Sequence, residues 1–359
     1  MTKAEPRPSS PMASSAADVP LRVLVVFSHP VQYHSPVFAA VSRDGRVDLT
    51  VAYCSLVGVK AAFDPDFAQA VAWDVPLLEG YRWQVVPNVS PRPGIHSFLG
   101  LINPGLASLI WSGRYDLIQV MGWSSLSFWI AMIVARMRGL PVMLGSDAVD
   151  LKIAAVGRFK AAMKRRVIPA IVRFAGGLTV ASTTGLDFHR SLGIPSDRLF
   201  LLPNVVDTDL FARSAQALTQ HDARSRLGLP TDRRIALFVA KLVPWKRPQD
   251  LVQALVGAPD WVAAFAGDGP QRPRLKQLAE ELGVSDRCHF LGFVNQGELP
   301  AVYRAADIVV LPSEQEPFGV VVCEGFACGV PALVSDAVGV QRNGECWETN
   351  TRLRHCLMQ

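Results

Sequence analysis

Residues 313–331 read SEQEPFGVVVCEGFACGVP, a polar loop that runs into an apolar segment of helical length. The segment lies between two short apolar runs, Asp307 to Leu311 and Ala332 to Ser335, which have the length and composition of buried strands. A strand, a helix and a second strand in this order are typical of the βαβ unit of a parallel sheet. Glu316 falls in the loop and Glu324 falls inside the expected helix.

The same alternation extends through the second half of the chain. Short apolar runs predict strands, and the segments between them predict helices. Strands are expected at 234–240, 261–266, 288–291, 307–311 and 332–335, and helices at 248–256, 271–282, 296–305 and 319–327. The pattern indicates a doubly wound α/β domain, whose ligands bind at the carboxyl ends of the strands.

The first half of the chain has a similar pattern. Its first apolar run, RVLVVF from Arg22 to Phe27, is typical of a strand that is buried on both faces. Further strands are expected at 47–52, 116–121, 141–144 and 177–181, with a helix over 126–138. We therefore predict an α/β protein with two Rossmann-like, doubly wound, parallel-sheet domains that face each other across a cleft.

The boundaries of these domains follow from shifts in composition. The segment PNVVDTDLF (203–211) and the polar stretch after it mark the junction. The predicted parts are a disordered tail over 1–20, a first domain over 21–203, a linker over 204–230, a second domain over 231–339 and an irregular tail over 340–359.

The composition of the 359-residue chain excludes several other classes of protein. Half of the residues are hydrophobic and 19% are charged, which excludes a disordered chain. The apolar run from Phe128 to Ala135 is too short to cross a bilayer. The six cysteines form no C-x-x-C pair, and the first residues lack the apolar stretch of a secretory signal. We therefore expect a cytoplasmic protein.

Glu316 and Glu324 are candidates for contacts with hydroxyl groups. Carboxylates only accept hydrogen bonds, so a pair of them at the start of a helix suits the hydroxyl groups of a sugar or a ribose. The backbone N–H groups of Phe318 and Gly319 would favour an anionic or oxygen-rich ligand at the same place. The residues alone leave open a capping Glu and an incidental acid.

Two further loops follow strands of the second half. AKLVPWKRP (240–248) carries Lys241 and Lys246, two cations that suit a diphosphate and would stabilise the charge on a leaving nucleotide. Ordinary solvent-exposed lysines are the alternative. AGDGPQ (266–271) carries Gly267, which permits close approach of a backbone, but the loop lacks the third glycine of G-x-G-x-x-G.

The loop after the first strand, FSHPVQYHSP (27–36), brings His29, Tyr33 and His34 to the expected cleft. The ordinary pKa of histidine is about 6.5, so these histidines are candidates for acid–base or hydrogen-bonding roles, with a structural role as the alternative. The later loop GSDAVD adds Asp147.

Positive charge is concentrated in one segment of a chain whose net charge is +5. Seven basic residues lie in 152–173, and no acidic residue occurs between Asp150 and Asp187. We expect a helix here that contacts anionic lipid head groups or phosphates, or else an ordinary solvated basic face. Nucleic-acid binding is not expected, because aromatic residues are not interleaved with the charges. The expected apolar side carries Phe159, Met163 and Val167, and the basic side Lys160, Lys164 and Arg165.

Taken together, these motifs resemble those of the retaining GT-B-fold glycosyltransferases of glycosyltransferase family 4, the glycosyl transferases group 1. The resemblance rests on PNVVDTDLF, AKLVPWKRP, GDGP, FLGFV and EPFGVVVCEGFACGVPALVS, in the order and spacing of the family over residues 200–338. It implies a hexosyltransferase-type enzyme that moves a sugar from a UDP- or GDP-linked donor to a hydroxyl of a glycan or lipid-linked acceptor. The configuration at the anomeric carbon would be retained, and the setting would be bacterial glycan, polysaccharide or glycolipid synthesis.

The resemblance also implies roles for individual residues. Glu316 would contact the donor sugar, Glu324 would hold the ribose, and Lys241 would replace the usual Arg at the diphosphate. On the acceptor side many members of the family have a His where this chain has Asp147. The implied donor-binding set is Lys241, Lys246, Gly267, Phe318, Gly319 and Glu324, and the implied catalytic set is Glu316, Asp147 and His34.

No metal and no further cofactor are expected. Two D-x-D strings, Asp64–Asp66 and Asp207–Asp209, have the carboxylates that a divalent ion prefers. The second string belongs to the turn motif of the family, whose members resemble metal-independent catalysts.

The end of the chain departs from the family pattern. After PALVSDAVG (331–339) the family continues with a glycine-bearing loop, a strand and helices, whereas this chain ends in VQRNGECWETNTRLRHCLMQ. We therefore expect a second domain that is incomplete, as in a C-terminally truncated or frameshifted form. Two alternatives to an active transferase stay open: an inactive or non-catalytic nucleotide-sugar-binding protein, and a GT-B-like sugar-nucleotide epimerase.

Overall fold

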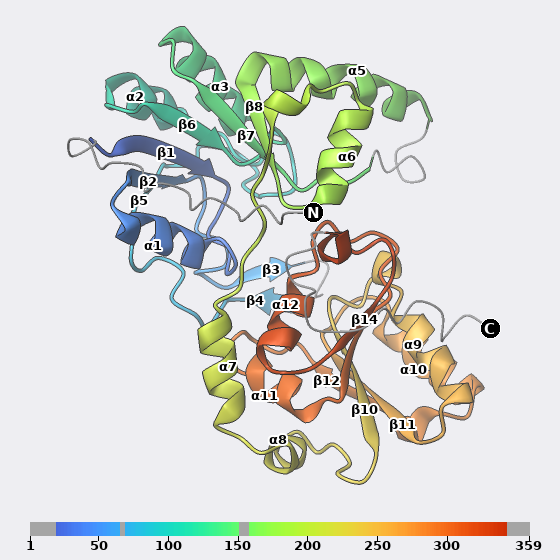
Figure 1. The fold of residues 1–359 in the computed structure, drawn as a ribbon. Helices are drawn as coiled ribbons and strands as arrows, with labels where there is room; N and C mark the ends of the chain where they lie inside the picture. Colours follow the sequence, from blue (N-terminus) through green and yellow to red (C-terminus); the bar gives the residue numbers. More distant parts are fainter. Residues whose placement is uncertain (1–18, 65–68, 151–157, 343–359) are drawn as a thin grey trace, which may run out of the picture.

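The computed structural model describes residues 19–64, 69–150 and 158–342. These residues form two α/β domains, drawn one above the other in Figure 1, and each domain is built on one parallel sheet. The two predicted tails fall mostly outside the described residues. The predicted α/β fold with two Rossmann-like domains is confirmed.

The first domain contains a seven-stranded sheet with the order β5-β2-β1-β6-β7-β8-β9. All of its strand pairs are parallel. The order reverses between β1 and β6, which is where a doubly wound sheet binds its ligands. The strands are β1 (Leu21–Phe27), β2 (Val47–Tyr53), β5 (Arg82–Val85), β6 (Leu117–Val120), β7 (Val142–Ser146), β8 (Gly176–Val180) and β9 (Leu199–Leu201).

Helices pack on both faces of this sheet (Figure 1). They are α1 (Ser35–Asp44), α2 (Gly105–Ser112), α3 (Leu126–Met137), α5 (Arg158–Ala175) and α6 (Thr183–Ser191). In β1 the five residues Val23–Phe27 are all buried. Leu24 packs in the same apolar cluster as Phe128 of α3, while Val25 packs with Phe38 of α1. The apolar run therefore forms a strand that is buried on both faces, as predicted.

The second domain contains a five-stranded parallel sheet with the order β12-β11-β10-β13-β14. Its order reverses between β10 and β13. The strands are β10 (Arg234–Val239), β11 (Trp261–Ala266), β12 (Cys288–Gly292), β13 (Ile308–Leu311) and β14 (Ala332–Val334). The helices are α9 (Pro248–Ala254), α10 (Arg272–Glu281), α11 (Leu299–Ala305) and α12 (Val320–Ala327).

The segment predicted as a linker, 204–230, is folded against the second domain. It forms α7 (Thr208–Gln216) and α8 (Gln220–Arg226). Phe211 is buried in the same apolar cluster as residues of the second sheet. Asp207 caps α7, because its Oδ1 accepts a hydrogen bond from the backbone N–H of Leu210 at 2.9 Å. The second D-x-D string is thus part of a helix start, and α7 and α8 belong to the second domain.

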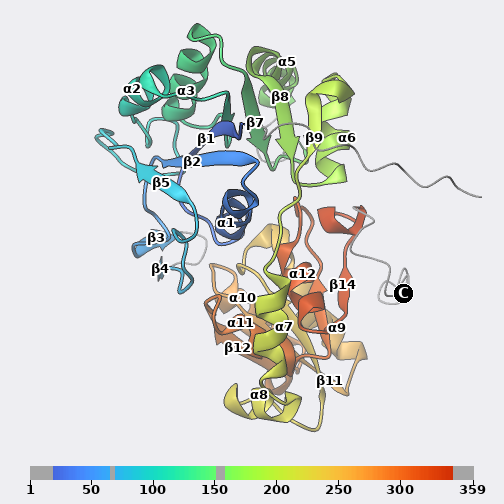
Figure 2. The same ribbon diagram turned by 60° about the vertical axis from the view of Figure 1, so that its left-hand side comes forward.

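Several elements of the first domain were not predicted from the sequence, namely α1, α2, α6, β5, β9 and one hairpin. Strands β3 (Ala62–Asp64) and β4 (Gln69–Val71) form an antiparallel pair outside the seven-stranded sheet. Figures 1 and 2 both place this hairpin at the boundary with the second domain. The four residues between the two strands are not among those described.

Most of the predicted boundaries lie within two residues of the observed ones, and two differences are more than such small shifts. The helix expected over 296–305 begins at Leu299, because Asn295–Glu298 form a turn in which the carbonyl of Asn295 accepts from the N–H of Glu298 at 3.1 Å. Val340, assigned to the irregular tail, is buried and lies in a 3-10 turn over Gly339–Arg342. Within the described ranges no helix has the length and apolar character needed to cross a membrane.

Candidate active site

Loops from the carboxyl ends of strands in both sheets meet between the two domains. Gln315, which follows β13, donates a hydrogen bond to Asp150, which follows β7. A small apolar cluster joins the domains nearby, where Ala181 of the first packs with Phe318 of the second. The edges at which the sequence predicted ligand-binding residues therefore face each other across the interdomain boundary.

Glu316 and Lys246 lie side by side in the second domain. The Nζ atom of Lys246 forms an ion pair with Oε2 of Glu316. Their side chains are only 13% and 19% exposed, so water screens the pair weakly. The backbone around Glu316 is held by the first residue of the 3-10 turn, because the N–H of Gly339 donates to the carbonyl of Glu316 at 2.9 Å. Two of the predicted site residues, from different loops, are thus brought together.

Lys241 is held by the first domain. Its Nζ atom lies 3.1 and 3.0 Å from the two carboxylate oxygens of Asp64, at the end of β3. Both side chains are largely shielded from solvent, at 29% and 27% exposure. From the sequence, Asp64 was considered only as part of a D-x-D string. The contact between Asp64 and Lys241 was not predicted, because the hairpin that carries Asp64 was not predicted.

The start of α12 lacks a side-chain cap. Gly319 occupies the N-cap position with φ of 96°, and no side chain accepts a hydrogen bond there. A Cβ atom at Gly319 would lie 2.7 Å from Cγ1 of Val338, so both the backbone and the available space require glycine. Phe318 before it is buried, and its carbonyl accepts from the N–H of Val340 at 2.7 Å. The orphan N–H groups of the first turn remain suitable for an anionic ligand.

Glu324 lies deeper than Glu316 and is 4% exposed. The hydroxyl of Tyr303 in α11 donates to Oε2 of Glu324 at 2.6 Å. Burial raises the pKa of Glu324 to about 7, while side-chain hydrogen bonds from Tyr303 and Gln296 act in the opposite direction. The predicted ribose contact is therefore a buried carboxyl group whose protonation changes near neutral pH. Its contact with ribose stays a prediction.

Gly267 allows β10 and β11 to end close together. A Cβ atom at this position would lie 1.9 Å from the carbonyl oxygen of Ala240, and φ of Gly267 is 155°. Its N–H donates to the carbonyl of Gly292 at 2.7 Å. The residue therefore shapes the edge of the second sheet that carries Lys241, and its contact with a ligand stays a prediction.

On the first-domain side, the charges of two carboxylates act on the hydroxyl group of Tyr33. Burial raises the pKa of Tyr33, and the negative charges of Asp147 and Glu316 raise it further. Asp147 keeps contact with solvent but is surrounded by protein, and the loss of solvation raises its pKa. The structure thus places Asp147 and Glu316 close enough to the hydroxyl group of Tyr33 for their charges to raise its pKa. The sequence predicted only that Tyr33 lies in a loop at the cleft.

His29 and His34 are held in the neutral form. Burial lowers the pKa of each to about 4. The ring of His34 packs 5.0 Å from the ring of Phe27 and 6.1 Å from that of Phe38. The Nδ1 atom of His29 lies 2.8 Å from the hydroxyl of Ser28. This environment favours packing for His34, and its acid–base role stays a prediction.

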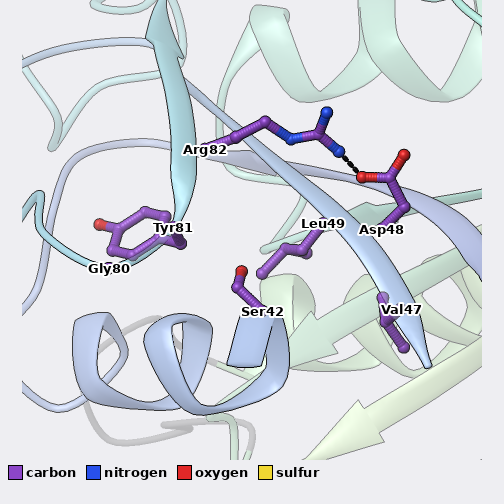
Figure 3. Close-up of a pocket in the computed structure, with 7 residues that line it drawn as sticks. All are labelled: Ser42, Val47, Asp48, Leu49, Gly80, Tyr81 and Arg82. Carbon is purple, nitrogen blue, oxygen red and sulfur yellow. Dashed lines mark ion pairs between the residues drawn. The ribbon is translucent and has the colours of Figure 1, made fainter. Parts of the chain in front are cut away.

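A separate hollow lies at the other edge of the first sheet (Figure 3). Asp48 and Arg82 form an ion pair in it, and Ser42 and Tyr81 contribute to its lining. These residues lie near the amino ends of β2 and β5, away from the loops that carry the predicted residues. The candidate active site is therefore the interdomain boundary, where the predicted residues lie. Within the three described ranges, no group of three or more His, Cys, Asp or Glu side chains is arranged to hold a metal.

Family models match both halves of the chain. Residues 219–343 match the family described as Glycosyl transferases group 1. Residues 64–205 match the family described as Glycosyl transferase 4-like domain. The two matches fall on the second and first domains of the structure.

Curated relatives carry related names. A D-inositol 3-phosphate glycosyltransferase from Mycolicibacterium smegmatis is 32% identical over 247 residues, which cover 66% of this chain and 53% of that protein. A protein of the same name from Xylanimonas cellulosilytica is 38% identical over 174 residues, covering 46% of this chain and 42% of that protein. The chain thus spans about half the length of the curated relatives it matches.

Solved structures share the fold. HepE from Anabaena, in complex with UDP and glucose, has a TM-score of 0.65 and 21% identity, covering 89% of this chain and 82% of that chain. Sucrose-phosphate synthase from Thermosynechococcus elongatus has a TM-score of 0.64 and 22% identity, with the same coverage. The chain is thus similar to a Glycosyl transferase 4-like domain over residues 64–205 and to the Glycosyl transferases group 1 family over residues 219–343, and it shares the fold of these GT-B structures.

Proposed function

We propose that the protein transfers a hexosyl group from a nucleotide-diphosphate sugar to an acceptor hydroxyl, with retention at the anomeric carbon. The observation that carries the proposal is the shielded pair of Glu316 and Lys246 beside the uncapped start of α12. A carboxylate that accepts from sugar hydroxyls lies next to a cation that binds the diphosphate. A donor that binds there would share Lys246 with Glu316.

The reaction we propose breaks the bond between the anomeric carbon and the diphosphate oxygen. The acceptor oxygen forms the new bond on the same face, and its proton passes to the leaving diphosphate. Lys246 and Lys241 would stabilise the negative charge that develops on the diphosphate, and Glu316 would orient the sugar. The pairing of each lysine with a carboxylate keeps both ammonium groups in place before the donor binds.

The acceptor would bind on the first-domain side, near Tyr33 and Asp147. The charge of Asp147 raises the pKa of Tyr33, and so does the charge of Glu316 from the other domain. The names of the curated relatives make D-inositol 3-phosphate one acceptor to test, beside glycan and lipid-linked acceptors. The complex of HepE with UDP makes UDP-sugars the first donors to test, followed by GDP-sugars.

Purified protein of residues 1–359 tests this function. We expect a UDP- or GDP-sugar to raise the melting temperature and, with an acceptor, to yield a glycoside whose anomeric proton has the configuration of the donor in NMR spectra. Turnover should persist in EDTA, since we propose a reaction without a metal or a further cofactor. Inversion would contradict the stereochemistry, a changed nucleotide sugar without acceptor would indicate an epimerase, and binding without turnover would indicate a non-catalytic binding protein.

We also propose that α5 contacts an anionic membrane at the inner, cytoplasmic face. Met163, Val167 and Phe174 are 52%, 45% and 39% exposed, and their spacing places them on one face of the helix. Arg166 and Arg173 of the same helix are also exposed. An exposed apolar stripe with arginines beside it suits an interface with anionic lipid. The predictions for 152–157, and for the side chains of Phe159 and Lys160, lie outside what the structure describes.

Liposome sedimentation tests the membrane contact. We expect binding to phosphatidylglycerol vesicles that weakens in high salt, and little binding to phosphatidylcholine vesicles. Val167→Asp and Arg166→Glu should each reduce binding, whereas Arg274→Glu on the exposed surface of α10 should not. Binding that is equal for both lipids and indifferent to salt would contradict the proposal.

A further inference from the structure

Three residues of the first domain, Ala72–Asp74, are hydrogen-bonded to one loop of the second domain. The carboxylate oxygens of Asp74 accept from the N–H of Gly297 at 3.0 and 3.1 Å. The side chain of Asn295 reaches back, donating to the carbonyl of Ala72 at 2.7 Å and accepting from the N–H of Asp74 at 3.3 Å. The two segments therefore satisfy each other's polar groups, as residues in one domain do.

The shape of the contact is as specific as its hydrogen bonds. A Cβ atom at Gly297 would lie 2.8 Å from Oδ2 of Asp74, so a larger residue there would displace the carboxylate. The ring of Trp73 lies 6.0 Å from that of Phe293. The N–H of Trp73 donates to the carbonyl of Gly58 at 2.9 Å, which fixes the segment to its own domain. The contact is thus anchored on both sides.

The same loop leads to Glu324. Oδ1 of Asn295, which accepts from Asp74, also accepts from the N–H of Gln296 at 2.9 Å. The side chain of Gln296 lies near Glu324 and favours the charged form of that carboxyl, which lowers its pKa. Hydrogen bonds therefore join Asp74 of the first domain to a loop whose Gln296 acts on a buried carboxyl group of the second.

We propose that Ala72–Asp74 and Phe293–Gly297 form an interdomain clasp that positions Gln296 against Glu324 and thereby prepares the donor site. The proposal rests on the proposed function, in which Glu324 contacts the donor ribose. Asp74 acts as a positioning residue, since it reaches Glu324 only through the loop. Donor binding then depends on the docking of the first domain as well as on residues of the second.

The clasp predicts a change in the titration of Glu324. Without Gln296 the charged form of Glu324 loses a hydrogen bond, so the pKa of Glu324 rises above its value of about 7. The titratable groups packed around Glu324 are Tyr303 and Cys328, and burial raises the pKa of each so that both remain neutral in this range. A contact that only joined the domains would lower stability and leave this titration unchanged.

The experiment measures the titration of Glu324 and the affinity for UDP and GDP in the full chain. The carboxyl of Glu324 is followed by carbon-13 NMR, with Glu324→Gln to assign its signal, and affinities are measured by calorimetry at pH 8. We expect Asp74→Ala and Gln296→Ala to raise the midpoint in the same direction, and the double variant to raise it no further than Gln296→Ala alone. Each single variant should bind the nucleoside diphosphate about tenfold more weakly, the loss of about one hydrogen bond to a charged group.

Two controls keep the test decisive. Asp74→Asn keeps an acceptor oxygen for Gly297 and should titrate like the wild type, while Asp44→Ala removes an exposed carboxylate elsewhere in the first domain and should change neither readout. A wild-type midpoint in Asp74→Ala, or shifts that add in the double variant, would overturn the clasp. If the wild type binds neither UDP nor GDP, the proposed function fails, and the titration alone decides whether the clasp positions Gln296.

Discussion

The two sides of the candidate site differ in how they carry charge. The second domain contributes Lys246 and Glu316, whose charges are fixed by a shielded ion pair. The first domain contributes His29, His34 and Tyr33, which burial keeps neutral at pH 7. Loops at equivalent edges of two similar sheets have thus acquired different electrostatic characters.

This difference indicates a division of work. A diphosphate carries fixed negative charge and needs cations that are already in place. An acceptor hydroxyl is neutral and needs hydrogen-bond partners that do not attract the diphosphate to the wrong side. The first domain also supplies Asp64, whose contact with Lys241 holds a cation of the other side. Breaking each side separately should therefore give different kinetic results.

The largest effect is expected for Glu316→Gln. Loss of the carboxylate removes the group that orients the sugar and leaves Lys246 without its partner. We expect the turnover number to fall by about 100- to 1,000-fold, as when one preorganised polar group is lost from an active site. Affinity for the free nucleoside diphosphate should change much less, because that ligand lacks the sugar. Glu281→Gln, on the exposed surface of α10, is the matched control, and wild-type turnover of Glu316→Gln would remove Glu316 from the mechanism.

Much of this second-domain side follows from the sequence. Residues that come directly after a buried strand lie at the ligand-binding edge of a parallel sheet, so Lys241 and Glu316 were placed correctly once the strands were recognised. The strand over Trp261–Ala266 was recognised because its apolar run is continuous and sharply bounded. The local sequence pattern was sufficient to place these residues, because a strand's apolar run also fixes where the next loop begins.

The contacts between the domains do not follow from the sequence. Strands β3 and β4 have three residues each, too few to show a period, so the position of Asp64 had no local signal. Its partner Lys241 is 177 residues away in the chain. The depth of Glu324 likewise depends on Tyr303, which another helix brings to it. Such features are set by packing between elements, which periodicity does not describe.

A smaller effect is expected for Lys241→Ala. Removal of the ammonium group breaks one ion pair of Asp64 and takes one cation from the diphosphate. We expect the affinity for UDP or GDP to fall about tenfold, since one hydrogen bond between charged groups is lost. Lys241→Arg should keep most of the affinity because it keeps the charge. Calorimetry measures both variants, and wild-type affinity in Lys241→Ala would mean that Lys241 serves only the contact with the hairpin.

The neutral histidines of the first domain predict a dependence of stability on pH. The pKa of His34 is about 4 in the folded state and returns to about 6.5 on unfolding. The unfolded chain therefore binds the proton first, and the free energy of unfolding falls as the pH drops from 6.5 towards 4. His34→Phe keeps the aromatic packing and should reduce this loss by about 1 kcal/mol, since the residue is only half-buried. Urea denaturation at pH 7, 5.5 and 4.5 measures it, with His221→Gln on exposed α8 as control, and an unchanged slope in His34→Phe would contradict the assignment.

The smallest effect is expected at the hollow in Figure 3, which tests whether charge matters only where the domains meet. Asp48 and Arg82 form an ion pair there, but their side chains are 39% and 65% exposed, so water screens the attraction. Asp48→Ala should lower the free energy of unfolding by about 0 to 1 kcal/mol, the usual value for an exposed pair, and leave sugar transfer unchanged. Urea denaturation and the transfer assay check both parts. A loss of turnover comparable to that of Glu316→Gln would show that the amino-terminal edge of the first sheet takes part in catalysis. The ion pairs at the interdomain boundary would then not differ from the exposed pair of Asp48 and Arg82 in their effect on turnover.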